Sequence, residues 1–448
     1  MNAHARWGWA GLVWLLWAGQ GLAGAAAPPR DVACRIDLDR GVLTAGSTQR
    51  VVLKVSLEAP TDAEAQRPPV NLAVVLDRSG SMSGSKIEKA KEAALEVLRR
   101  LGPQDRFALV LYESQVETLV PSQSAANTEW IEARIRGIAA GGTTALFGGV
   151  SQGAAEVRKQ TGDAHFVHRI ILLSDGLANV GPSSPADLAR LGGALIKEGI
   201  SVTTVGVGTD YNEDLMTQLA QRSDGNNYFV ESSADLPRIF RAELGDVLNV
   251  VARKVILEIE CTGGVRPLRI IGRDGRIRGS TVEIALNQLY GGQAKYALVE
   301  VEVPATAADA SRDIALARCT YEHALTLEPG STTARAAARF SEREAEVVRS
   351  ANAAVQSDLA LNVIALAKDE AVDLAAAGKT AEAVAQMQQR SKELRELGEK
   401  YDNKDVLRQS RDLKAKAAAV EAKGLDSRDR KEWRNDSFMD RNQQSYRQ

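Results

Sequence analysis

The chain has 448 residues, of which 44% are hydrophobic and 25% charged, and its formal net charge is −2. Because one hydrophobic core rarely serves so long a chain, roughly two to four folded domains are expected. The balanced charge argues against nucleic acid and anionic membranes as partners.

The N-terminal segment has the pattern of a secretory signal peptide. A weakly basic start precedes an apolar run over residues 7–17, and small residues continue to Ala27. The Ala23-x-Ala25 pattern predicts cleavage after residue 25, so residues 1–25 are removed and the protein is exported to the periplasm or cell envelope of a Gram-negative-type bacterium. An uncleaved anchor is the alternative, since residues 7–27 approach the length of a bilayer span, and only then would the membrane be a partner.

The next segment is of β type. Residues 32–60 contain patches in which apolar and polar or small residues alternate, most clearly from Val51 to Leu57. A polar stretch with prolines over 61–69 then predicts a linker.

Residues 69–250 combine strands and helices in alternation. Apolar runs typical of strands buried on both faces lie at 70–76, 107–112, 169–174 and 200–207, and shorter strands at 115–120 and 227–230. Helical spacing or helix-start signals predict helices at 85–101, 128–138, 145–159, 184–198, 212–222 and 234–250. This order predicts an α/β fold with a doubly wound, mostly parallel sheet, and Ser85 with Glu88 is expected to form a capping box.

After Arg253 the β pattern returns and continues to residue 330. We expect residues 253–330 to join residues 32–60 in one β-sandwich, with the α/β domain inserted between them, because either segment alone offers few strands. All three cysteines lie in these two segments, Cys34, Cys261 and Cys319. Export permits a disulfide, but the odd count leaves open whether one pair forms or none.

The C-terminal part is predicted to be helical over 333–424. It is rich in Ala, Glu, Lys and Arg, and breaks at 377–379 and 401–404 divide it into three helices. We expect these helices to bury their apolar faces on each other or on the rest of the protein. The polar, charged residues 425–448 are predicted to be a disordered tail.

Three loops at the carboxyl ends of predicted strands, or just before a helix, carry oxygen ligands. They are Asp77-Arg78-Ser79-Gly80-Ser81, Gly141-Gly142-Thr143-Thr144 and Ser174-Asp175-Gly176. Such loops converge at one edge of a doubly wound sheet. Carboxylates and hydroxyls without His or Cys favour Mg²⁺, with Mn²⁺ or Ca²⁺ as alternatives, over Zn²⁺.

These loops resemble the metal-ion-dependent adhesion site of von Willebrand factor type A (vWA) domains. The resemblance implies that Asp77, Ser79, Ser81, Thr143 and Asp175 are the metal ligands, with Thr143 preferred to Thr144 because it directly follows the glycine pair. It covers about residues 69–250 and extends to the loop 206–214, which is similar to that of exported bacterial vWA proteins. The β-plus-vWA layout is also similar to inter-alpha-trypsin inhibitor heavy chains, without their N-terminal signature domain.

The sequence gives little support for an enzymatic function. Phosphatases with an Asp nucleophile need a second Asp where Ser79 stands, and a Ser nucleophile needs a nearby His base. His165 and His168 are expected in a solvated loop at the opposite end of the sheet, and Lys86 is expected on a solvated helix face. No nucleotide-binding glycine motif is present in the sequence.

The expected function is therefore metal-dependent protein binding in the cell envelope, without enzymatic activity and without a small-molecule substrate. The cation would capture an acidic side chain of a partner protein, because weak hydroxyl ligands leave it electron-poor. The alternative is an envelope scaffold or assembly factor that acts mainly through the helical region, with a metal that serves stability alone.

Overall fold

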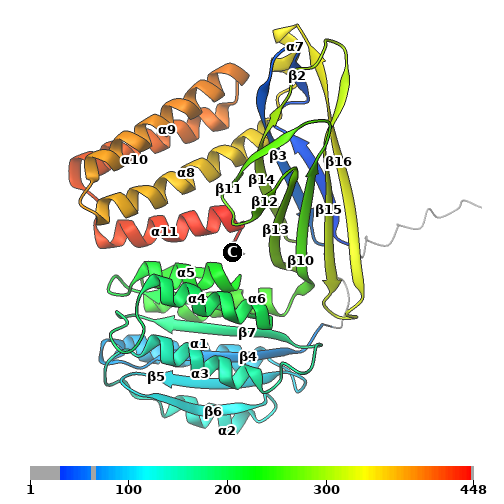
Figure 1. Cartoon of the computed structure of the whole chain (residues 1–448). Coiled ribbons are helices and arrows are strands. Elements are labelled where there is room, and N and C mark those ends of the chain that lie inside the picture. The colour runs from blue at the N-terminus through cyan, green and yellow to red at the C-terminus, as the bar shows by residue number, and fades with distance from the viewer. Residues whose placement is uncertain (1–30, 62–66, 445–448) are drawn as a thin grey trace, which may run out of the picture.

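The structure, a computed structural model, describes residues 31–61 and 67–444 (Figure 1). The predicted signal peptide over 1–25 lies outside these residues. Within the described ranges, no helix combines the length and the apolar character that crossing a bilayer requires.

The α/β fold class predicted from the sequence is confirmed. Six strands form one sheet in the order β6-β5-β4-β7-β8-β9, in which β4, β5, β7, β8 and β9 are parallel and the edge strand β6 is antiparallel. The strands are β4 Val70–Asp77, β5 Arg106–Tyr112, β6 Val116–Ser124, β7 Val167–Ser174, β8 Ile200–Val207 and β9 Asn227–Val230. Every residue of β4, β7 and β8 is buried, as expected for strands covered on both faces.

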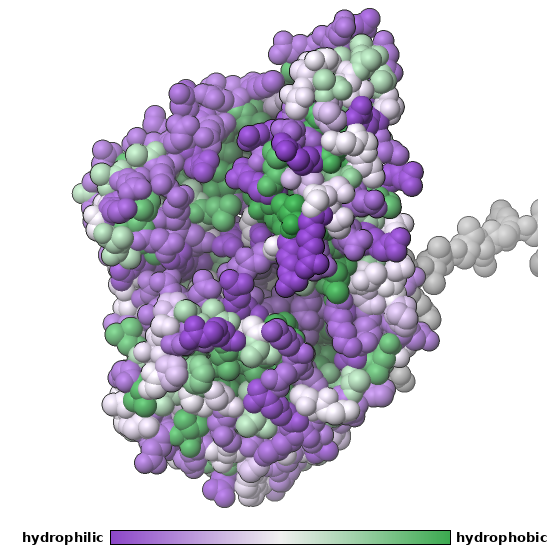
Figure 2. All heavy atoms as spheres, viewed as in Figure 1, coloured by the Kyte–Doolittle hydropathy of each residue, from purple (hydrophilic) through white to green (hydrophobic). Residues whose placement is uncertain are grey.

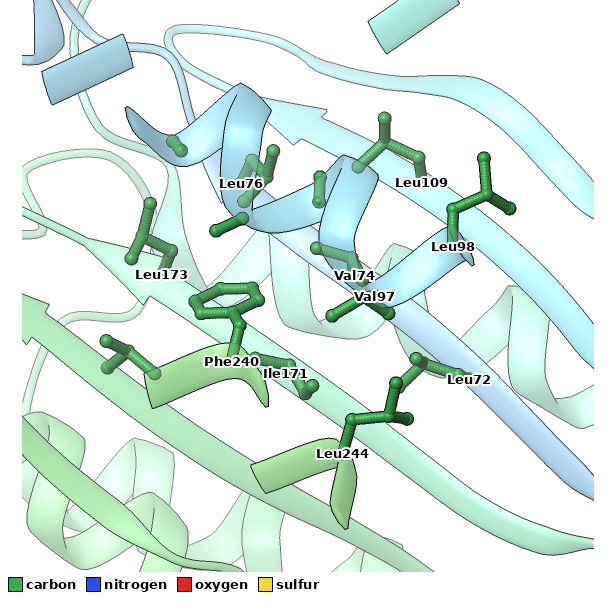
Figure 3. Packing of buried hydrophobic residues seen from close by; sticks show 14 of the residues in the cluster. Leu72, Val74, Leu76, Val97, Leu98, Leu109, Ile171, Leu173, Phe240 and Leu244 are labelled. Carbon is green, nitrogen blue, oxygen red and sulfur yellow. The ribbon is translucent and has the colours of Figure 1, made fainter. Parts of the chain in front are cut away.

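Helices cover both faces of this sheet. The core on one face includes residues of α1 Ser85–Arg100, α2 Thr128–Arg136 and α6 Leu236–Val247. Figure 3 shows part of it, where Leu76 and Ile171 lie near Val97 and Phe240. The other face packs against α3 Leu146–Arg158, α4 Pro185–Leu195 and α5 Glu213–Ser223. The expected capping box of α1 is wrong, because the helix begins at Ser85 itself and Gly84 is the N-cap.

The β-sandwich is built from segments on both sides of the α/β domain. One sheet has the order β1-β3-β14-β11 and the other β12-β13-β10-β15-β16-β2. The N-terminal segment supplies β1 Ala33–Leu38, β2 Val42–Thr44 and β3 Gln49–Glu58. The second segment supplies β10 Val250–Cys261, β11 Arg266–Ile271, β12 Arg276–Arg278, β13 Thr281–Tyr290, β14 Ala294–Val303, β15 Ser311–His323 and β16 Pro329–Ser341. Each sheet therefore contains strands from both segments, and one apolar core lies between them.

The C-terminal part differs from the prediction at both ends. Residues 333–341 belong to strand β16 rather than to a helix, because their side chains alternate between exposed and less exposed positions against β15. Four helices follow, α7 Glu344–Arg349, α8 Ala353–Ala376, α9 Thr380–Tyr401 and α10 Lys404–Lys423. The described part of the predicted disordered tail forms a further helix, α11 Ser427–Asn442, since its charged side chains find partners on α5 and α8.

Helix α11 lies between α8 and α5, so it joins the helical region to the α/β domain (Figure 1). Its contacts to α5 include two ion pairs: Lys431 bonds Glu213 at 3.0 Å, and Arg434 bonds Asp214 at 2.9 Å. Its Trp433 is part of the apolar core of the helical region. The face of the molecule in Figure 2 is mostly hydrophilic, with apolar residues scattered among polar ones.

His168 is buried, which corrects the expectation of a solvated loop histidine; His165 is exposed beside Asp163. Strand β7 begins two residues earlier than predicted and pairs His168 with Asn71 of β4. The Asn71 amide donates one N–H to the Val157 carbonyl and one to His168 Nδ1, which is therefore the unprotonated ring nitrogen. Burial, and then the charge of Arg253, lower the pKa of His168 to about 4.

This histidine is expected to make the protein acid-sensitive. The unfolded chain takes up a proton near pH 6.5, whereas the folded chain resists protonation down to about pH 4. The contribution to stability is therefore complete above pH 6.5 and is lost as the pH falls from 6.5 to 4, by about 2–3 kcal/mol. Urea unfolding at pH 7 and pH 4.5 measures the loss, and His168→Gln should show a smaller one. Equal losses in both proteins would contradict the assignment.

Candidate metal centre

The predicted site residues lie at the carboxyl ends of neighbouring strands. Asp77 is the last residue of β4 and Ser174 is the last residue of β7, and the two strands pair in parallel up to Leu76 and Leu173. The Ser174 hydroxyl donates to Asp77 Oδ2 at 3.0 Å. The loop after each strand therefore begins at the same edge of the sheet.

Short contacts join the first loop to the third. The Ser79 amide donates to Asp77 Oδ1 at 2.8 Å, which folds the loop back over the strand end. The hydroxyls of Ser79 and Ser81 lie 3.1 Å apart, and the Ser81 hydroxyl donates to Asp175 Oδ1 at 2.7 Å. Four of the five predicted ligands, two carboxylates and two hydroxyls, are thus brought together.

The fifth predicted residue, Thr143, is not brought to this cluster. Its side chain is exposed, and its hydroxyl and amide both bond the Ser114 hydroxyl at 3.0 Å. Thr144 is buried instead, and a Cβ placed on Gly176 would lie 3.4 Å from its hydroxyl and 3.5 Å from that of Ser81. Adjacent residues of the loop thus direct their side chains to different sides, and the Thr144 hydroxyl is the one on the side of Ser81.

The two carboxylates of the cluster are buried, and Lys86 is the one basic side chain in the described ranges that pairs with them. Asp77 and Asp175 have no exposed surface. Burial raises the pKa of Asp77, hydrogen bonds from Ser79 and Ser174 oppose this rise, and the charge of Asp175 adds to it. Two anionic groups in one buried cluster are stabilised by any cation that binds between them.

Lys86 is a residue that the sequence analysis placed wrongly on a solvated face. Its ammonium lies 2.5 Å from Asp175 Oδ2, and its side chain is only 28% exposed. Lys86 is on the first turn of α1, five residues after Ser81, where a helix returns toward the strand ends. Ser174, which the sequence analysis placed in the third loop but not among the ligands, bonds Asp77 at the edge of the site.

The donor set fits a hard divalent cation. It consists of carboxylate and hydroxyl oxygens, which Mg²⁺, Mn²⁺ and Ca²⁺ prefer. In the described ranges, no group of three or more His, Cys, Asp or Glu side chains is arranged to hold a metal ion. A site of the zinc type is therefore not found there, and the oxygen cluster relies on Ser and Thr hydroxyls beside its two carboxylates.

Comparison with known proteins identifies the family of the α/β domain. A model of the von Willebrand factor type A domain family matches residues 71–242. These residues form a vWA domain. Domains of this family generally mediate protein–protein interactions, often with a bound divalent metal, and are generally not enzymes.

Relatives of the vWA domain occur in bacteria and animals. The uncharacterized protein sll0103 of Synechocystis is 29% identical over 48% of this chain and 52% of its own length. Uncharacterized protein YfbK of Escherichia coli is also 29% identical, over 47% of this chain and 37% of its own. Human inter-alpha-trypsin inhibitor heavy chain H3 is 29% identical over 38% of this chain and 20% of its own. The chain thus spans about half the length, or less, of these curated relatives.

Two solved structures share the fold over most of the chain. A von Willebrand factor type A protein from Catenulispora acidiphila has a TM-score of 0.67 and 20% identity, and the match covers 85% of this chain and 89% of that one. The ArnB paralog VWA2 from Sulfolobus acidocaldarius has a TM-score of 0.61 and 18% identity, and the match covers 91% and 97%. The vWA domain together with its β and helical parts is therefore a shared architecture.

Proposed function

We propose that the vWA domain binds a divalent cation, with Mg²⁺ as the first choice, and that this cation docks an acidic side chain of a partner protein. The proposed ligands are Asp77, Ser79, Ser81, Thr144 and Asp175. The observation that carries the proposal is the chain of contacts from Ser79 through Ser81 to Asp175, beside the buried carboxylate of Asp77.

The charges of the site support capture of an external anion. The two carboxylates face the ammonium of Lys86 as well as the proposed divalent cation, so positive charge would be in excess, and the hydroxyls are neutral and weak ligands. A cation held in this way retains affinity for a further carboxylate. The bound metal supplies an electrophilic docking point, and the chain's own residues hold it at the strand ends.

The surroundings of the site support a protein as partner. Leu177 and Val180, in the loop after Asp175, are exposed by 59% and 37%. This loop is held in place, because the Thr144 carbonyl accepts N–H bonds from Asn179 and Val180 at 3.1 and 3.3 Å, and Asn179 Oδ1 accepts one from Thr144. Fixed apolar side chains beside a charged docking point are typical of protein-binding surfaces.

Titration calorimetry with Mg²⁺ tests the proposed site. The wild-type chain should bind one ion, and Ser79→Ala and Thr144→Val should each weaken binding at least tenfold because each removes a ligand. Thr143→Val is the matched control and should bind like wild type. Absence of uptake of Mg²⁺, Mn²⁺ and Ca²⁺ by the folded wild type would refute the metal site, and loss on Thr143→Val alone would restore the sequence-based assignment.

Export to the cell envelope belongs to the same proposal. The predicted signal peptide over residues 1–25 is what supports this part of the proposal. The alternative, a scaffold acting through its helical region, has less support, since α8 and α11 use their polar faces on each other and on the vWA domain. Partner capture that survives EDTA and Asp77→Ala would favour the scaffold.

A further inference from the structure

Two of the three cysteines lie on strands of the β-sandwich that face each other. Cys34 is in β1 of one sheet, and Cys319 is in β15 of the other. Cys319 is fully buried in the core between the sheets, and Cys34 packs against the same core. Strand β1 comes within 8 Å of β15, measured between Cα atoms, so the sheets are close at this point.

A neighbouring contact indicates which residues of the two strands oppose each other. The Tyr321 hydroxyl accepts a hydrogen bond from the Val32 amide at 3.2 Å. Side chains on one face of a strand recur every second residue. Asp31 lies 3.4 Å from His323 and Val32 bonds Tyr321, so the two segments run in opposite directions. Two residues onward from Val32 is Cys34, and two residues back from Tyr321 is Cys319, so this direction places the two thiols against each other.

The acid–base behaviour of the thiols agrees with this placement. Burial raises the pKa of Cys319 to about 12, and the nearby Cys34 sulfur contributes to the rise. An electrostatic effect between two thiols requires that they be close together.

The third cysteine is too far away to pair with Cys319. In the β10–β15 ladder, Cys319 lies opposite Leu257, and Cys261 lies opposite Ala315. Four residues along a strand correspond to about 13 Å, whereas a disulfide needs Cα atoms about 4.4–6.8 Å apart. Cys34 and Cys319 thus face each other, and Cys261 lies too far from Cys319 to pair with it.

We propose that Cys34 and Cys319 form a disulfide in an oxidising compartment and that Cys261 remains a thiol. The structure has all three as thiols. In the oxidation, each of the two thiols loses a proton, one S–S bond forms, and two electrons pass to the disulfide of a thiol–disulfide oxidase, whose own S–S bond opens to two thiols. The new bond closes residues 34–319 into one covalent loop that includes the whole vWA domain and links the two segments of the sandwich.

Peptide mapping of the full chain tests the proposal directly. The chain is produced by secretion into the periplasm of Escherichia coli, which is oxidising, and free thiols are blocked with iodoacetamide during denaturation. Trypsin then releases each cysteine in its own peptide, residues 31–35, 255–269 and 319–335. We expect peptides 31–35 and 319–335 to be linked, and peptide 255–269 to be alkylated.

The cysteine variants supply the controls. Cys261→Ser should retain the link between the other two peptides, and Cys34→Ser should lose it without a new link. Reduction with dithiothreitol should lower the thermal midpoint of wild type and Cys261→Ser by about 5–10 °C, and that of Cys34→Ser much less. Three alkylated cysteines in the secreted protein, or a bridge to Cys261, would overturn the proposal.

Discussion

Arg434→Met is expected to lower the free energy of unfolding by about 2–3 kcal/mol, because it removes a largely buried guanidinium that bonds three carboxylates. Arg434 of α11 is 8% exposed. Its guanidinium bonds Asp214 of the vWA domain at 2.9 Å, Asp369 of α8 at 3.1 Å, and Asp373 of the same helix. One side chain thus connects three helices from two parts of the chain, and its loss leaves carboxylates with a missing partner.

A matched variant separates this effect from a general loss of charge on α11. Arg428→Met removes a cation from the same helix that also bonds the vWA domain, at Glu231, but both side chains of this pair are more than half exposed. Exposed ion pairs contribute at most about 1 kcal/mol. Urea unfolding of both variants measures the difference. Similar losses in the two variants would show that the buried cluster around Arg434 is not what holds α11 in place.

The vWA domain could be predicted from the sequence because its strands are marked by apolar patterns within short stretches of the chain. The apolar runs that became β4, β7 and β8 are buried on both faces, and such strands are recognisable without knowledge of their neighbours. The loops after β4 and β7 could also be placed together, since the carboxyl ends of parallel strands meet at one edge.

The side chains that could not be placed from the sequence are those whose direction or burial depends on residues far away in the chain. Thr143 and Thr144 are identical in type and adjacent, and only the position of Ser114 and Gly176 in space decides which of them turns inward. Lys86 belongs to a helix whose lysines suggest a solvated face, yet it pairs with Asp175 in the loop after β7.

The tail is the clearest example of this limit. Its sequence is mostly polar and charged, which favours disorder, although Trp433 and Phe438 are buried in the structure. Helix α11 is nevertheless ordered, because acidic residues on α5 and α8 match its basic ones: Glu213, Asp214 and Asp369. An interface formed by charged side chains leaves no periodic apolar stripe in the sequence, so it could not be predicted from the pattern.

A second large effect is expected at the junction between the vWA domain and the β-sandwich. Arg169 of β7 has no exposed surface and donates to Tyr290 at 2.7 Å and to Gln288 at 3.0 Å, both in the sandwich strand β13. It also lies 3.8 Å from Glu243 of α6. Arg169→Met should therefore destabilise the protein by about 3–5 kcal/mol, since a buried carboxylate loses its cation and two polar groups lose a donor.

The appropriate control is Arg222→Met. Arg222 also joins the vWA domain to the sandwich, through Asp274 at 3.2 Å, but both side chains are about half exposed, so a loss below about 1 kcal/mol is expected. Magnesium calorimetry adds a second readout. Arg169 precedes Ser174 by five residues of extended strand, about 16 Å, so Arg169→Met should reduce urea resistance while the folded variant retains wild-type affinity for Mg²⁺. A parallel loss of stability and metal affinity would instead mean that the sandwich junction and the metal edge of the vWA domain behave as one coupled unit.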